Sequence, residues 1–212
     1  MIRKAPILKV CGMKHSGNIR AVADLQPDLM GFIFYEKSPR YAGNINPEVL
    51  AEIPSSIKKT AVFVSEPIEV MRSTANTYDI DTLQLHGDET PLQCLQLQGE
   101  DFTVIKAFPI AEAKDFSATE DYEGCCHYFL FDTKTSQYGG SGKHFDWSLL
   151  EHYKGETPFL LSGGIGLEDI EMLQKINHPL LLGFDVNSRF EIEAGMKNIE
   201  KLREFKNKIS EL

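Results

Sequence analysis

The chain alternates short apolar runs with stretches of helical periodicity, and this alternation most constrains its fold. Several of the runs are nearly continuous in Val, Ile, Leu and Phe, which is typical of parallel strands buried on both faces. The eight runs span residues 7–12, 29–35, 60–64, 82–86, 102–108, 128–132, 158–162 and 180–186. Eight strands separated by helices predict an α/β fold, a compact single-domain (β/α)₈ barrel over residues 1–212.

Helical stretches follow several of these runs. The clearest is the C-terminal one, in which apolar side chains recur every three or four residues from Met196 to Leu212. Further helices are predicted at 67–77, 91–98 and 167–176, and a short, poorly patterned one at 111–119. An open doubly wound sheet is the competing layout, but it commonly carries a G-x-G-x-x-G turn, which the sequence lacks.

Composition narrows the functional classes. A formal net charge of −9 argues against a nucleic-acid partner, since such proteins present a basic face to phosphates. No run approaches the roughly 18 apolar residues that span a bilayer. The four cysteines show no Cys-x-x-Cys spacing and the six histidines are dispersed, so we expect no metal site, reduced thiols and a cytoplasmic location.

Reactive side chains cluster where the predicted strands end. In a parallel barrel the catalytic groups lie at these carboxyl ends. Cys11 there is either a small buried hydrophobe or a thiolate base or nucleophile. Asp132 is either a hydrogen-bonded loop anchor or a carboxylic acid or base facing the pocket.

Three further side chains carry open alternatives. Arg40 is either a surface charge or a bidentate partner of a carboxylate, and His86 is either a satisfied pocket histidine or a catalyst. Lys106 is either an ion-pair partner or a Schiff-base lysine.

Two glycine-rich segments suggest ligand contacts. The segment 162–166 contains Gly163 and Gly164 and leads into a predicted helix, where backbone N–H groups can approach a phosphate. Asn187 and Ser188, after the eighth strand, are placed to complete that site. The loop 138–143, with Gly140, is either a flexible surface turn or a lid over the ligand.

At these residues the chain resembles the phosphoribosylanthranilate isomerase family. The matching stretches occur in family order and at family spacing over almost the whole chain: 9–12, 31–40, 84–87, 131–133, 138–143, 145–147 and 161–164. The resemblance implies a cofactor-free (β/α)₈ barrel that catalyses an Amadori rearrangement of an aminoaldose phosphate. It also implies that Cys11 is the general base, Asp132 the general acid, Arg40 the anchor of the anthranilate carboxylate and Gly163–Gly164 the phosphate loop.

These observations give one set of predicted site residues and a small phosphorylated molecule as the ligand. The predicted catalytic residues are Cys11 and Asp132, and the predicted substrate-binding residues are Arg40, His86, Gly140, Gly163, Gly164, Asp185, Asn187 and Ser188. We expect a monomer or a homodimer, without nucleic-acid or membrane partners.

Two alternative functions stay open, and one of them rests on a departure from the family pattern. After the eighth strand the family usually reads Asp-Val-Ser-Ser-Gly, whereas this chain has Arg189 in place of the glycine. A binding protein that has lost its chemistry is therefore one alternative. The other is a different sugar-phosphate isomerase, epimerase or lyase, which Lys106 and the phosphate loop would serve.

Overall fold

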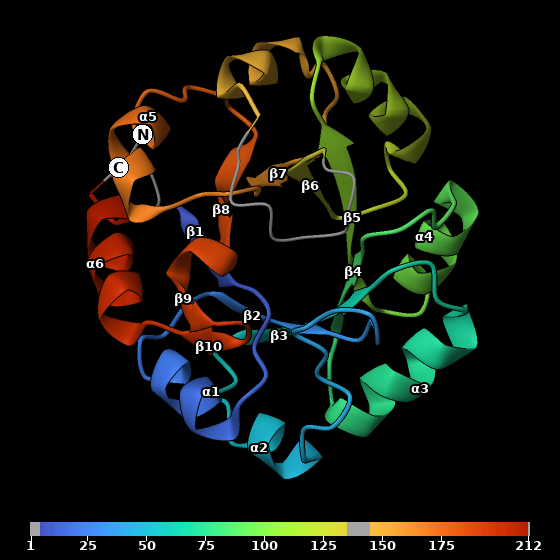
Figure 1. Cartoon of the computed structure of the whole chain (residues 1–212). Helices are drawn as coiled ribbons and strands as arrows, with labels where there is room; N and C mark the ends of the chain where they lie inside the picture. The colour runs from blue at the N-terminus through green and yellow to red at the C-terminus, as the bar shows by residue number, and fades with distance from the viewer. Residues whose placement is uncertain (1–4, 135–144, 212) are drawn as a thin grey trace.

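The predicted barrel is present, with eight parallel strands that close on themselves in chain order (Figure 1). The computed structural model describes residues 5–134 and 145–211. All eight predicted strands are confirmed within a few residues. They are β1 Ile7–Val10, β2 Leu29–Ile33, β3 Lys58–Phe63, β4 Thr82–Leu85, β5 Thr103–Ile110, β6 Tyr128–Thr133, β7 Phe159–Leu161 and β8 Leu181–Val186.

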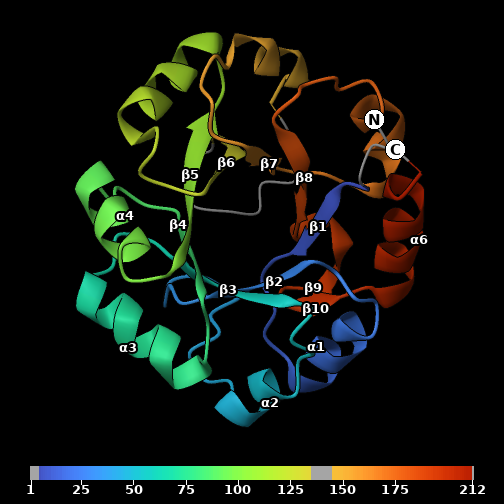
Figure 2. The same cartoon turned by 180° about the vertical axis from the view of Figure 1, so that it is seen from behind.

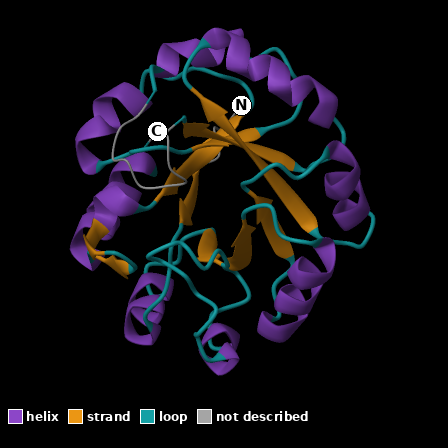
Figure 3. Ribbon diagram, turned by 45° about the vertical axis from the view of Figure 1, so that its right-hand side comes forward, coloured by secondary structure: helices purple, strands orange, loops and turns teal. Residues whose placement is uncertain are grey.

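Helices form a ring around the barrel (Figures 2 and 3). The α-helices are α1 Ser16–Ala23, α2 Pro47–Ala51, α3 Ile68–Tyr78, α4 Pro91–Gln98, α5 Ile170–Leu173 and α6 Ile199–Ile209. The 3₁₀ helices are η1 Ala113–Tyr122, η2 Trp147–His152, η3 Leu167–Asp169 and η4 Ser188–Phe190. Within 5–134 and 145–211, every helix is too short or too polar to cross a membrane.

Local sequence signals explain why the best-predicted helices begin where they do. Before α4, the Thr90 hydroxyl accepts from the backbone of Gln93, whose side chain accepts in return from the backbone of Thr90. Pro91 then takes the first helical position, where its missing N–H costs nothing. The helix predicted at 91–98 is thus confirmed.

Two apolar clusters lie on the two sides of the strands. The large one fills the space between the barrel and the helices. The small one fills the interior towards the amino ends of the strands, and consists of Ile105, Ala107, Leu130 and Leu160 with a few partly buried neighbours. Further along β1 and β8, the interior instead holds Lys9 and Asp185, which the strand register sets side by side.

Aromatic packing explains why 3₁₀ segments suffice after β5 and β6. Phe131 on the outer face of β6 meets Phe116 of η1 and Tyr153 after η2, each edge-on with ring centroids 5.0 Å apart. The Tyr153 hydroxyl also donates to the carbonyl of Thr157 at 2.8 Å. Large rings cover the sheet here without a long helix, so the helix expected at 111–119 is replaced by η1.

The C-terminal helix begins later than predicted. Met196 belongs to a short antiparallel hairpin, β9 Glu191–Glu193 with β10 Met196–Lys197, and α6 starts at Ile199. Gly195 turns the hairpin in the left-handed region, with φ +85°. The Asn198 side chain then caps α6 by accepting from the backbone of Lys201. Similarly, the helix predicted at 167–176 is divided into η3 and α5.

Side chains of α1 hold this hairpin against the barrel mouth. The Asn18 side chain donates to the carbonyl of Lys197 and accepts from its N–H, at 2.9 and 2.7 Å. This pair of bonds fixes the backbone of Lys197, and Figure 1 shows the hairpin lying beside α1.

Replacing Gly183 with Ala tests barrel closure. A Cβ at Gly183 would overlap the backbone of Ile7 on β1, which cannot move without opening the seam. We expect Gly183→Ala to lower the free energy of unfolding by about 1–3 kcal/mol, measured by urea denaturation. Gly17→Ala is the matched control, because its new Cβ meets open space and should leave stability equal or slightly higher. Equal stabilities of the two variants would contradict this account of the seam.

Candidate functional site

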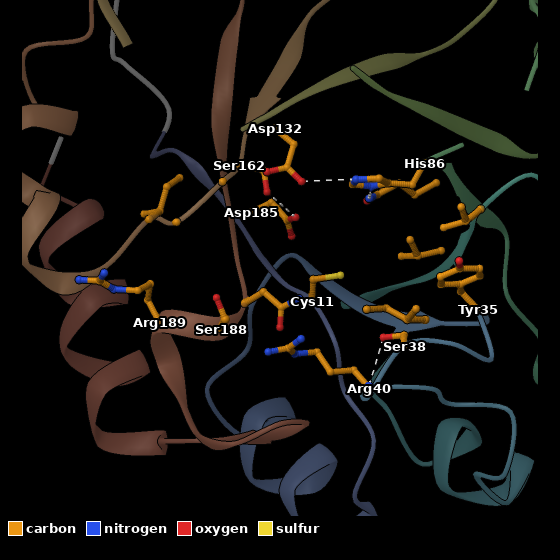
Figure 4. A pocket seen from close by; sticks show the side chains of 18 residues that line it. Cys11, Tyr35, Ser38, Arg40, His86, Asp132, Ser162, Asp185, Ser188 and Arg189 are labelled. Atoms are coloured by element: carbon orange, nitrogen blue, oxygen red, sulfur yellow. Dashed lines mark hydrogen bonds and ion pairs between the residues drawn. The ribbon is translucent and has the colours of Figure 1, made fainter. Parts of the chain in front are cut away.

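The carboxyl ends of the strands surround a pocket lined by polar and apolar side chains (Figure 4). Nine of the ten predicted site residues line it. They are Cys11, Arg40, His86, Asp132, Gly163, Gly164, Asp185, Asn187 and Ser188. The tenth, Gly140, lies with the loop 138–143 outside the described residues. Residues far apart in the sequence thus meet at one mouth, as strand ends in a parallel barrel must.

Cys11 follows β1 directly and continues its pairing with β8, since its N–H donates to the carbonyl of Val186 at 2.9 Å. Its thiol packs on Gly31 of β2, where a side chain would overlap it. Gly12 follows at φ +75°, and a Cβ there would meet the side chains of Arg40 and Asn187. Burial raises the pKa of the Cys11 thiol, and the nearby ammonium groups oppose that rise.

Asp132, at the end of β6, is held by two neighbours. Its Oδ1 accepts from the backbone of Thr133 at 2.7 Å, and its Oδ2 lies 3.3 Å from Nε2 of His86. The other ring nitrogen of His86 lies 2.9 Å from the side-chain amide nitrogen of Gln84. When that amide donates, the ring proton is on Nε2 and faces Asp132. Figure 4 shows the Asp132 carboxylate and the Cys11 thiol entering one cavity from different strands.

The glycine turn after β7 packs directly against this acid. Gly163 and Gly164 both have positive φ, +91° and +70°. A Cβ at Gly163 would come within 2.8 Å of Oδ1 of Asp132 and within 2.5 Å of the Thr133 nitrogen. Only glycine therefore allows the loop to lie beside Asp132, which leaves backbone rather than side chains facing the pocket.

Arg40 is oriented by a carboxylate that sequence reasoning missed. Its Nη2 donates to Oε2 of Glu191 at 2.6 Å, and its Nε donates to the same carboxylate. Lys197 donates to Oε1 of Glu191 at 2.7 Å and to the Asn187 side chain at 2.6 Å. Burial works to raise the pKa of the Glu191 carboxyl, but Arg40 and Lys197 together hold that pKa below its usual value.

Asp185 is also engaged within the protein. Oδ1 accepts from Nζ of Lys9 at 2.9 Å, and Oδ2 accepts from the Ser162 hydroxyl at 3.1 Å. Burial works to lower the pKa of the Lys9 ammonium, but Asp185 and Cys11 raise it above its usual value. Direct contact between Asp185 and a ligand stays a prediction, whereas its contact with Lys9 is observed.

Arg189, the departure from the family pattern, lines the rim of the pocket. Its guanidinium forms an ion pair with Glu168 of η3. In Figure 4 the side chain extends away from the centre of the pocket, where Cys11 and Asp185 lie. In this arrangement the charge of Arg189 is directed to the rim.

Lys106 is not in the pocket. It lies on the outer face of β5, where Nζ donates to the carbonyl of Gly87 at 2.7 Å and to Glu89 at 3.2 Å. The ion-pair alternative is therefore correct for this lysine and the Schiff-base alternative is wrong. Across 5–134 and 145–211, no three His, Cys, Asp or Glu side chains are grouped to hold a metal ion.

The hairpin residues Glu191 and Lys197 escaped sequence reasoning because both lie in a polar stretch that looks exposed. Lys9 escaped it for a different reason. Its distance of two residues from Cys11 on a strand, which puts both on one face, was the available signal.

Comparison with known proteins agrees with this geometry. The family described as N-(5'phosphoribosyl)anthranilate (PRA) isomerase matches residues 8–208. The N-(5'-phosphoribosyl)anthranilate isomerase of Parabacteroides distasonis is 52% identical over 201 residues, covering 94% of this chain and 91% of that protein.

Solved structures of phosphoribosylanthranilate isomerases have the same fold. The Thermotoga maritima structure superimposes with a TM-score of 0.84 at 30% identity, over 98% of this chain and 100% of that one. Another, in complex with reduced 1-(o-carboxyphenylamino)-1-deoxyribulose 5-phosphate, has a TM-score of 0.80 at 26% identity, with the same coverage.

Glu191→Gln tests the buried carboxylate. Loss of this charge leaves two buried cations unpaired, so we expect the free energy of unfolding to fall by about 3–5 kcal/mol near pH 7. The pKa of Glu191 is lower in the folded protein than its usual value of 4.5, which we take for the unfolded chain. The stability that the carboxylate contributes is therefore fully present above pH 4.5, and it is lost as the pH falls through the pKa of the folded protein. Wild type and variant should therefore converge in acid, as measured by urea denaturation from pH 3 to 7.

Glu52→Gln is the control for this measurement. Glu52 also pairs with an arginine, Arg20, but both side chains are about half exposed. This variant should change stability little at any pH. A Glu191→Gln defect that persists unchanged at pH 3 would contradict the assignment.

Proposed function

The chain belongs to the N-(5'-phosphoribosyl)anthranilate isomerase family, and from this premise we propose that it converts N-(5'-phosphoribosyl)anthranilate into 1-(o-carboxyphenylamino)-1-deoxyribulose 5-phosphate in tryptophan biosynthesis. The observation that carries the proposal is the pair of Cys11 and Asp132 facing one pocket from β1 and β6. A thiol and a carboxyl on different sides of a bound sugar are the groups that this rearrangement needs.

In the first step Asp132 acts as the general acid. It gives a proton to the furanose ring oxygen, the bond between that oxygen and C1 breaks, and the nitrogen lone pair forms the C1=N bond of a protonated Schiff base. Asp132 becomes a carboxylate, and the backbone of Thr133 and Nε2 of His86 stabilise that charge by hydrogen bonds.

In the second step Cys11 acts as the general base. Its thiolate takes the proton from C2, so an S–H bond forms as the C–H bond breaks. The electron pair becomes the C1=C2 double bond, and the electrons of the C1=N bond return to nitrogen. The resulting enol tautomerises to the ketone, when C1 gains a proton and the C2 hydroxyl loses one. Acid and base groups of this kind each contribute roughly 10²–10⁴ in rate.

Two anchors at the ends of the substrate position it for these steps. We assign the phosphate to the backbone of Gly163 and Gly164 with Asn187 and Ser188, and the anthranilate carboxylate to Arg40. Glu191 uses the Nε and Nη2 edge of Arg40, so a ligand carboxylate meets the Nη1 side. Anchors remote from the reacting atoms lower the barrier by orienting the substrate.

The remaining alternatives have less support. A lyase that uses Lys106 as a Schiff base would need this lysine in the pocket, whereas it pairs with Glu89 behind the sheet. A binding protein without chemistry rests on Arg189 alone, which pairs with Glu168 at the rim.

The four free thiols agree with a cytoplasmic location. The oligomeric state, monomer or homodimer, is still a prediction, and analytical ultracentrifugation would measure it.

Cys11→Ala and Asp132→Asn test the assigned roles. We expect each to lower kcat by at least about 10²-fold, because each removes a proton-transfer group without removing an anchor. The assay follows the fluorescence of freshly prepared phosphoribosylanthranilate, with a blank for its spontaneous hydrolysis. Cys125→Ala, at a cysteine outside the pocket, is the control and should keep wild-type turnover. Near-normal turnover by both site variants would contradict the mechanism, and an inactive wild type would contradict the proposed function.

Arg189→Gly restores the usual family residue and tests the rim. Because the Arg189 guanidinium pairs with Glu168 and points away from the pocket centre, we expect KM to change by less than about threefold, in line with the small value of exposed ion pairs. Steady-state kinetics at two salt concentrations measures this. A tenfold or larger rise in KM would instead show that Arg189 binds the phosphate.

A further inference from the structure

Five charged side chains are buried beside and below Cys11. Three are cations, Lys9, Lys197 and Arg40, and two are anions, Asp185 and Glu191. Their side chains are between 0% and 12% exposed. Each anion is in contact with at least one of the cations, at 2.6–2.9 Å.

The cluster holds one more positive charge than negative. An uncompensated charge inside a protein costs several kcal/mol, so such a site favours a further anion. Cys11 lies against the cluster and is neutral as a thiol. Its ionisation brings the formal charge of the group to zero, and the thiolate is the form that acts as a base.

Lys9 is the cation best placed to stabilise that thiolate. It lies on β1 two residues before Cys11, which continues the strand's pairing with β8, so both side chains face the barrel interior. Its ammonium acts on the Cys11 thiol by charge. Its side chain is fully buried, so water does not screen this interaction.

The other charged groups near the thiol act less directly. Lys197, from β10, acts on Cys11 by charge, but its Nζ is held by Glu191 and Asn187. Asp185, from β8, disfavours the thiolate by charge and fixes Lys9 at 2.9 Å. From β2, the neighbour is the uncharged Gly31.

We propose that Lys9 is a positioning residue for the base of this enzyme: its buried ammonium is the counter-ion of the Cys11 thiolate, and Asp185 holds that ammonium in the barrel interior. The inference rests on the role of Cys11 in the proposed function. Lys9 itself neither gives nor takes a proton during the reaction, and acts through the thiol alone.

The test measures Cys11 directly and needs no substrate. The rate at which iodoacetamide alkylates Cys11 is followed from pH 6 to 10 by mass spectrometry of the peptide that contains it. Lys9→Met removes the charge at similar side-chain length. We expect alkylation at pH 7 to slow by at least about tenfold and the midpoint of the pH profile to move upward, because one pKa unit is a tenfold change in thiolate. With substrate, kcat should fall much more than KM rises.

A second variant changes the reactivity in the opposite direction. Asp185→Asn removes the anion and leaves the ammonium of Lys9 to the thiol, so alkylation at pH 7 should become faster than in the wild type. If the Lys9–Asp185 pair served folding alone, the alkylation rate of Cys11 would change in the same direction in Lys9→Met and in Asp185→Asn. Lys9→Arg keeps the charge and should restore most of the lost reactivity.

Two further variants serve as controls for folding and for the loss of a buried lysine. The double variant Lys9→Met/Asp185→Asn removes both partners of the ion pair, so neither is left without the other. It replaces either single variant that fails to fold, and its alkylation should be slower than that of the wild type. Lys106→Met removes another buried lysine, which pairs with Glu89 behind the sheet, and should leave the Cys11 profile unchanged.

The outcomes separate this inference from the proposed function. Wild-type alkylation profiles in folded Lys9→Met, or in the folded double variant, would overturn the role of Lys9 even in an active enzyme. A wild type that alkylates as expected but does not turn over phosphoribosylanthranilate would overturn the function and leave the counter-ion in place.

Discussion

Closure of the barrel between β1 and β8 brings the two ends of the chain together and so forms the pocket. The register of this seam pairs Lys9 with Asp185, residues that lie 176 positions apart in the chain. It also sets Cys11 beside Val186, so that the segment after β8 runs past the thiol. Without closure, Cys11 would be at one edge of a sheet and Asp185 near the other, and no common pocket would form.

The two ends of the barrel interior differ in polarity, and the apolar end serves stability while the charged end serves chemistry. Towards the amino ends of the strands it is apolar, with Ile105, Leu130 and Leu160 in contact. Towards the carboxyl ends it contains buried charges, which are expensive to desolvate and rarely stabilise a fold on balance. The large cluster between strands and helices carries most of the apolar burial. The strand ends are therefore free to hold groups chosen for reactivity rather than for stability.

Much of the fold could be predicted because its signals are local. A parallel strand buried on both faces is a continuous apolar run, and all eight were found in this way. The start of α4 was likewise readable from Thr90 and Pro91. The hairpin β9–β10 was not readable, because Met196 on β10 continues the apolar period of the helix that follows it.

The candidate site followed a similar division. Cys11, Asp132 and the Gly163–Gly164 turn could be proposed from their places at strand ends, since the parallel topology puts all such ends on one rim. Their electrostatic neighbours could not, because Glu191 looks like any exposed acid in a polar segment. Its burial depends on the hairpin folding back over the mouth.

Local patterns in the amino-acid sequence are enough to predict which segments become strands, that the strands run parallel, and hence which side chains share the mouth of the barrel. How those side chains pair depends on the folded barrel. In the folded barrel Asp185 pairs with Lys9 and Glu191 pairs with Arg40, whereas Lys106 lies on the outer face of the sheet and pairs with Glu89. The physical reason is range: periodicity acts between residues a few positions apart, whereas charge pairing depends on distance in space, which barrel closure alone sets.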